Sequence, residues 1–113
     1  MGLDDYFATA TERERPIFES VLEHLRSLGD VHVEPVAVGI FIKRDRSFVE
    51  LRPMQRWVAL SFPRSTKLAH PRISRAVPAS AGRWYHVVNV RDGSEIDDEL
   101  RDLLTDAWFD VAP

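Results

Sequence analysis

The stretch that decides the fold is VGIFIKRDRSFVELRPMQRWVALSF, residues 38–62. Its apolar residues come in short runs, which the polar segments RDRS and RPMQR separate. Short apolar or alternating runs bounded by turn residues are typical of β-strands joined by hairpins. We therefore predict strands at residues 38–43, 48–52 and 57–62, arranged as an antiparallel meander.

Two more strands are predicted outside this stretch, at residues 31–36 and 83–91. Between the meander and the last strand, residues 64–82 contain two prolines, four Arg or Lys residues and no acidic residue. Connections of this length in a compact domain are often functional or mobile, and we interpret this one as a basic loop that can contain a helical turn. The sequence therefore predicts an antiparallel sheet of about four to five strands.

An amphipathic helix is predicted before the strands. Its apolar residues recur at three- and four-residue spacing from Phe18 to Leu28, and Gly29 follows as a C-terminal stop. Thr11 with Glu14 fits a capping box near its start. The segment DDYFATA, which precedes this box, is expected to form a short turn or helix.

A second amphipathic helix is predicted after the last strand. Its apolar stripe runs from Ile96 to Val111, and Ser94 with Asp97 fits a second capping box. Two helices of this length can cover one face of a sheet. We therefore predict an α+β fold, with an N-terminal and a C-terminal helix packed on one face of the antiparallel sheet, as a single domain over residues 1–113.

Strand alternation sorts the side chains between the two faces of the predicted sheet. The face toward the helices is expected to hold Val38, Ile40, Ile42, Val49, Leu51, Val58, Leu60, Phe62, Trp84, His86, Val88 and Val90. The opposite face is expected to interleave rings with cations: Phe41, Lys43, Phe48, Arg52, Trp57, Arg83, Tyr85 and Arg91. The same alternation adds uncharged and acidic residues to this second face: Glu50, Ala59, Ser61, Val87 and Asn89.

The net charge of −3 conceals an acidic–basic–acidic pattern along the chain. Residues 43–91 hold eleven basic and two acidic side chains, and the segments on either side are acidic. Such a block favours a surface for an anionic ligand or nucleic acid. Two simpler interpretations stay open, because acidic residues suit helical ends and the excess of arginine over lysine also follows from coding bias.

Composition and motifs exclude several function classes. The chain has no cysteine, which excludes disulfides, thiolate metal sites and cysteine nucleophiles. No apolar run approaches the roughly 18 residues that span a bilayer, and the start MGLDDY is acidic where a signal peptide is basic, so we expect a cytoplasmic protein. Neither metal-ligand spacing nor a nucleotide or nucleophile motif occurs, so we predict no metal and no cofactor.

The candidate ligand-binding residues come from the outer sheet face, the last strand and the basic loop: Arg52, Trp57, Arg72, Arg75, Arg83, Tyr85 and His86. Rings beside cations on a sheet can stack on bases and neutralise phosphates. The first hypothesis is therefore a non-enzymatic binding or accessory module for an anionic ligand or nucleic acid. The second is an interaction domain, whose aromatic face is buried against a partner chain or a second copy in a homodimer.

A third hypothesis is a small enzyme that uses His86, Tyr85 and Arg72 in a pocket beneath the basic loop. Histidine is the commonest general base, but a lone histidine on an apolar strand face is more often a packed core residue. The sequence therefore favours a protein without catalytic residues.

Five short segments, in this order and spacing, resemble the bacterial domain of unknown function 5655 (DUF5655): DDYF, FIKRDRSFVELRP, PRISR, WYHVVNV and EIDDELRDLLTDAW. The resemblance covers nearly the whole chain and implies a helix–sheet–helix architecture, in a domain found alone or appended to larger proteins. It transfers no catalytic residue to this sequence. Trp108 is a departure, since the family pattern leads us to expect Tyr after Ala107.

Overall fold

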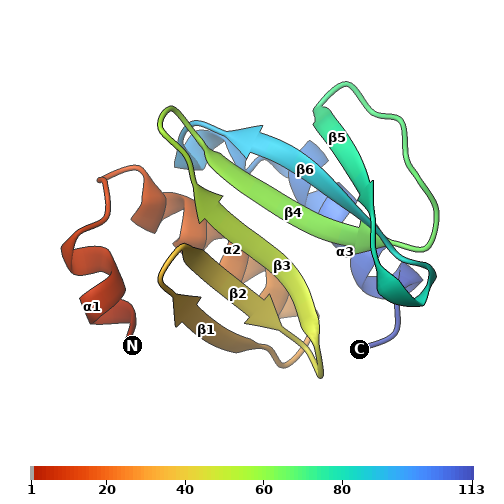
Figure 1. The fold of residues 1–113 in the computed structure, drawn as a ribbon, viewed down its shortest axis with the longest axis horizontal. Coiled ribbons are helices and arrows are strands. Elements are labelled where there is room, and N and C mark those ends of the chain that lie inside the picture. The colour runs from red at the N-terminus through yellow and green to blue at the C-terminus, as the bar shows by residue number, and fades with distance from the viewer. Residues whose placement is uncertain (1) are drawn as a thin grey trace.

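A computed structural model describes residues 2–113 of the chain. The chain forms one β-sheet, with helices before and after the strands in sequence (Figure 1). The α-helices are α1 (Leu3–Ala8), α2 (Glu14–Leu28) and α3 (Asp98–Asp110). The strands are β1 (His32–Val36), β2 (Gly39–Lys43), β3 (Ser47–Pro53), β4 (Val58–Arg64), β5 (Ile73–Pro78) and β6 (Trp84–Val90). Two short 3-10 turns are η1 (Ser80–Gly82) and η2 (Gly93–Glu95). The predicted α+β class is confirmed.

The described strands form one antiparallel sheet in the order β1-β2-β3-β4-β6-β5. The sheet has six strands, so the prediction of four to five was wrong. The missed strand is β5, which lies inside the segment interpreted as a basic loop. Its sequence ISRAVP is mostly exposed, because β5 pairs only with β6 at the edge of the sheet. An edge strand of this kind lacks the apolar alternation that marks a buried strand.

One face of the sheet is covered by α2 and α3, which lie behind it in Figure 1. The core between helices and sheet takes apolar side chains from α2, α3 and strands β2, β3, β4 and β6. The short helix α1 sits beside β1 and α2, where the Phe7 ring lies 5.5 Å from the Phe18 ring. Among residues 2–113 no helix covers the other side of the sheet, which we call the free face.

The two long helices begin differently from the prediction. At the start of α2 the Glu14 carboxylate accepts hydrogen bonds from Thr11 N at 2.6 Å and Thr11 Oγ1 at 2.8 Å, but the N-cap is Arg13, so only this half of the predicted capping box forms. At the start of α3 the predicted box of Ser94 with Asp97 was wrong. Asp97 is itself the N-cap and accepts from Leu100 N at 3.1 Å, whereas Ser94 belongs to η2. An aspartate N-cap accepts a hydrogen bond from a backbone N–H that has no partner within the helix, and its negative charge interacts favourably with the positive N-terminal end of the helix dipole.

The predicted alternation fails at Val38, Phe48 and Arg83, and Arg83, expected on the outer face, is buried just before β6. Val38, expected in the core, lies in the turn between β1 and β2 and is 56% exposed. Phe48, expected on the outer face, is 1% exposed and packs edge-to-face on Trp108, with 5.4 Å between ring centroids. The register of β2 and β3 shifts beside it, through the pairs Ile42 with Val49 and Lys43 with Ser47. Phe48 is therefore the extra residue of a β-bulge, which turns its side chain inward.

Candidate ligand-binding face

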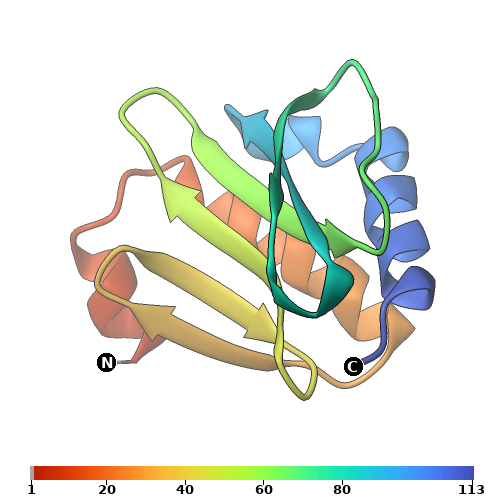
Figure 2. The same ribbon diagram turned by 45° about the vertical axis from the view of Figure 1, so that its right-hand side comes forward.

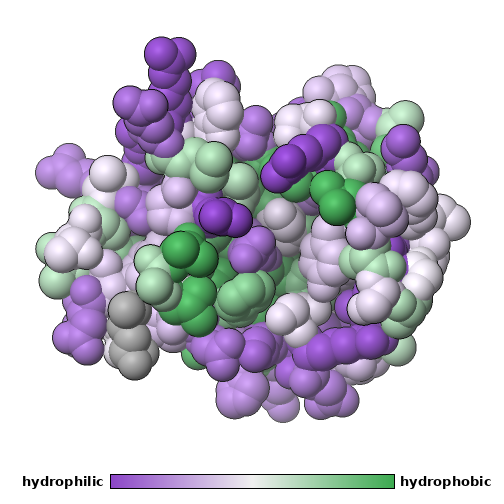
Figure 3. All heavy atoms as spheres, in the orientation of Figure 1, coloured by the Kyte–Doolittle hydropathy of each residue, from purple (hydrophilic) through white to green (hydrophobic). Residues whose placement is uncertain are grey.

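The free face of the sheet is hollowed. The hollow has a volume of about 390 Å³, and three of the candidate residues line it: Arg52, Trp57 and Arg75. Its other lining residues are Glu50, Met54, Ala59, Ser61, Ser74, Val87 and Asn89. Figure 3 looks onto this face, with the hollow near its middle and hydrophobic atoms gathered over β1 and β2. We call this feature the free-face hollow.

The hollow lies over β4 and β6, which carry small side chains on this face. The neighbouring strands β3 and β5 carry larger ones, such as Arg52 and Arg75. Glu50 on β3 stands opposite Ser61 on β4, which pairs with Val87 on β6, which in turn pairs with Arg75 on β5. Residues paired across antiparallel strands share one face, so these four form a row across the floor. Figure 2 shows β5 standing forward of the sheet on this side, and Ser74 and Arg75 of this strand line the hollow.

The arginines around the hollow have free guanidinium groups. Within residues 2–113, the side chains of Arg52, Arg75 and Arg91 form no ion pair and no hydrogen bond. Arg91 lies over the Trp57 ring, with 5.6 Å from its guanidinium carbon to the ring centroid. An unpaired guanidinium keeps all of its donors available for a carboxylate or phosphate. The hollow therefore combines a flat ring with cationic donors.

Arg72 lies elsewhere. Its guanidinium donates to the Asp97 carboxylate at 2.6 Å and to the Glu95 backbone oxygen at 2.7 Å. Two hydrogen bonds lower the pKa of Asp97. The larger effect comes from the backbone N–H of Leu100 and the smaller one from the Arg72 guanidinium. Arg72 therefore ties the segment before β5 to the start of α3, and the structure does not bring it to the free face.

The rest of the segment before β5 is attached in the same way. The Asp110 carboxylate accepts from Ser65 N at 2.7 Å, and the Leu68 N–H donates to His86 Nε2 at 2.9 Å. His70 Nε2 lies 3.8 Å from the Glu99 carboxylate. These contacts fix residues 65–72 against α3 and β6, so that the segment positions β5 and, with it, Arg75.

Replacing Arg72 with glutamine is expected to lower the free energy of unfolding by about 1 kcal/mol, since its partners Asp97 and Glu99 are solvent-exposed and such contacts contribute little each. Urea denaturation followed by circular dichroism measures the change. Arg75→Gln is the matched control, because Arg75 has no partner within residues 2–113, and its stability should stay within about 0.5 kcal/mol of wild type. Equal losses in both variants would contradict the anchoring role of Arg72.

The other candidates from the last strand do not line the hollow. Arg83 is buried and donates to the Ala112 backbone oxygen at 2.5 Å. Tyr85 shares the free face, and its hydroxyl donates to the Ser47 backbone oxygen at 3.1 Å. Both side chains therefore hold other parts of the chain in place.

His86 is fully buried at 0% exposure, and its ring stacks on Phe62 with 5.5 Å between centroids. Burial lowers its pKa, an effect that the nearby Phe62 and Trp84 carbonyls partly offset. Nε2 accepts the Leu68 N–H, which leaves the proton of the neutral ring on Nδ1, a buried atom without a partner in residues 2–113. His86 does not line the free-face hollow.

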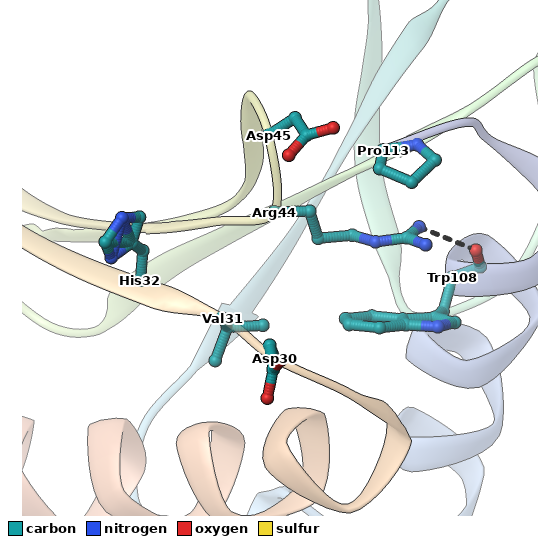
Figure 4. A pocket seen from close by; sticks show the side chains of 7 residues that line it. All are labelled: Asp30, Val31, His32, Arg44, Asp45, Trp108 and Pro113. Carbon is teal, nitrogen blue, oxygen red and sulfur yellow. Dashed lines mark hydrogen bonds between the residues drawn. The ribbon is translucent and has the colours of Figure 1, made fainter.

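A second hollow, of about 430 Å³, lies at the end of α3 and is lined in part by Arg44, Trp108, Asp30 and Asp45 (Figure 4). Its arginine is already bound. The Arg44 guanidinium lies 3.9 Å from the Trp108 ring centroid and donates to the backbone oxygen of Trp108 at 2.8 Å. Because the Arg44 guanidinium already binds Trp108 and the carboxylates of Asp30 and Asp45 lie beside it, this hollow is a poorer site for an anion than the free-face hollow.

Sequence reasoning alone found three of the residues that line the free-face hollow. Alternation also placed Glu50, Ala59, Ser61, Val87 and Asn89 on the correct face, but it gave no reason to single them out as site residues. Met54 and Ser74 were missed because the first lies in a turn and the second in the unrecognised strand β5. The signal that could have found most of them was the shared strand face.

None of the helices between residues 2 and 113 combines the length and apolar character needed to cross a membrane. Over the same residues, no group of three or more histidine, aspartate or glutamate side chains is arranged to hold a metal ion. A family model described as Domain of unknown function (DUF5655) matches residues 3–110. No curated protein and no solved structure matches the chain.

Proposed function

This chain belongs to the family described as Domain of unknown function (DUF5655), and we propose that it is a non-enzymatic binding module for an anionic ligand. One observation carries the proposal: the free-face hollow is lined by Trp57 and by two arginines, Arg52 and Arg75, that form no ion pair or hydrogen bond in residues 2–113, and Arg91 adds a third cation over the Trp57 ring. A hollow of about 390 Å³ is within the size range of small-molecule sites.

The shape and charge of the hollow fit a ligand that joins a phosphate to a planar ring. A guanidinium binds phosphate through paired, charge-assisted hydrogen bonds, and an indole stacks on any base. The chemistry shared by a free nucleotide and by one residue of a single-stranded nucleic acid meets both requirements. The experiment below distinguishes these two sources.

Replacing Arg52 or Arg75 with glutamine is expected to weaken binding of a labelled single-stranded oligonucleotide about tenfold, which corresponds to about 1.4 kcal/mol for one charge-assisted contact. Each change should also reduce the slope of log affinity against log salt by about 0.7. Fluorescence anisotropy titrations at several salt concentrations measure both effects. Competition by unlabelled mononucleotides tests whether a free nucleotide is sufficient.

Arg26→Gln is the matched control, because Arg26 is exposed on α2, on the opposite side of the sheet, and forms no ion pair within residues 2–113. It removes the same charge without touching the hollow. Absence of binding by the wild-type protein at low salt would overturn the proposal. The proposal would also fail if Arg52→Gln and Arg75→Gln bound no more weakly than Arg26→Gln.

A second candidate function is self-association through the free face, which Met54 and Val77 favour because they are 51% and 42% exposed. A two-fold dimer on this face would bring the unpaired arginines of the two copies together, and like charges repel. We therefore expect a monomer in sedimentation equilibrium. A dimer that survives high salt and is lost in Val77→Asp would favour this second function over ligand binding.

A further inference from the structure

The residue of the free-face hollow that a purely anionic ligand does not explain is Glu50. It is half-buried on β3, and it lines the hollow beside Arg52, two residues further along the same face. Within residues 2–113 its carboxylate forms no hydrogen bond and no ion pair, unlike Glu34, which lies 2.9 Å from Lys43 on the same face. A free carboxylate inside a cationic site repels an anion that offers nothing else.

We infer that the ligand of this hollow presents a hydrogen-bond donor to Glu50 as well as an anion to the arginines, which points to nucleotides whose base carries an exocyclic amino group. The inference rests on the proposed function and deepens it by naming the ligand class. A carboxylate is an acceptor that pairs with the amino group of cytosine, whereas the corresponding carbonyl of uracil offers only an acceptor.

The geometry of the strands allows one ligand to meet these groups together. Trp57 lies one residue before β4, about 13 Å along the chain from Ser61 at the usual rise per residue, and Glu50 stands opposite Ser61. Trp57, Glu50 and Ser61 all line the same hollow, so a ring that lies against the indole can turn its edge toward the Glu50 side chain. Asn89, opposite Ala59 between these two rows, adds an amide that both donates and accepts.

Cytidine and uridine monophosphates are the sharpest probes, because they share one phosphate and one sugar and differ at the amino or carbonyl group of the base. The wild-type protein is expected to bind cytidine monophosphate about tenfold more tightly than uridine monophosphate in calorimetric titrations. Glu50→Gln, which keeps the shape but adds an amide donor and removes the charge, should reverse or abolish this preference and bind inorganic phosphate more tightly than wild type does.

Glu34→Gln is the matched control, since it removes a carboxylate from the same sheet face outside the hollow, and the preference should survive it. Equal binding of the two nucleotides by wild type, with weakened binding in Arg75→Gln, would overturn this inference while leaving the proposed function standing. Failure of both nucleotides and of the oligonucleotide to bind would remove the proposed function itself.

Discussion

Replacing Phe48 with alanine is expected to lower the free energy of unfolding by about 3–5 kcal/mol. Phe48 is 1% exposed, its ring packs edge-to-face with that of Trp108, and its ring centroid lies 5.7 Å from the Arg44 guanidinium carbon. Truncation removes these contacts and leaves a cavity, which the surrounding strands fill only in part because the bulge fixes the local backbone. Urea denaturation followed by circular dichroism measures the loss.

Phe41→Ala provides the matched control for this experiment. Phe41 lies on the free face of the neighbouring strand β2 and is half-buried, so the same chemical change should cost much less there. A loss of less than about 1 kcal/mol in Phe48→Ala, or equal losses in the two variants, would contradict the inward orientation of Phe48. It would also restore the outer position that simple alternation predicted.

The bulge at Phe48 illustrates which part of the fold the sequence could not predict. Regular alternation correctly assigned the core face of β4, where Val58, Leu60 and Phe62 are all buried. It failed at Phe48 because one extra residue in β3 shifts the register with β2, and nothing in the local pattern marks that shift. Alternation is a property of an undisturbed ladder, so a single bulge is enough to reverse a residue's face.

The missed strand β5 shows a different limit. Its residues read as loop because an edge strand that leans out of the sheet buries little and needs no apolar pattern. What holds it in place is long-range: the contacts of Arg72 with Asp97 and of Leu68 with His86 join segments far apart in the sequence. Contacts of that kind leave no pattern in the local sequence, whereas α2 and α3 are marked by their apolar periodicity.

The candidate site was predictable only as far as alternation extends. Alternation assigned Arg52 and Trp57 to the free face, and both line the hollow, although Trp57 lies one residue before β4. Arg75 reached the list through the charge of its segment, and β5 brings it to the same hollow. Arg83 was misplaced because it precedes β6, where a 3-10 turn ends and alternation does not apply.

Acidification is expected to destabilise the protein through His86. Because burial lowers its folded-state pKa below the ordinary value of 6.5, the unfolded chain takes up the proton more readily than the folded protein. The stability is therefore complete above about pH 6.5, and it falls as the pH drops from there toward the folded-state pKa, by up to about 1.4 kcal/mol per pH unit. Asp97 and Asp110, whose pKa values are lowered from 3.8, lose their contribution only at more acidic pH.

His86→Gln isolates this effect, because glutamine can still accept the Leu68 N–H but does not titrate. Urea denaturation at about pH 7 and about pH 5 measures how much free energy of unfolding is lost on acidification, and this loss should be smaller in the variant than in wild type. His32→Gln, at an exposed position, is the control and should lose as much as wild type does. His24, whose pKa burial also lowers, accounts for a residual loss. Identical losses in wild type and His86→Gln would refute the assignment. In wild type, protonation of His86 at Nε2 places an N–H donor opposite the Leu68 N–H, so that this hydrogen bond is lost. Acid therefore weakens the attachment of the segment that positions β5 and Arg75.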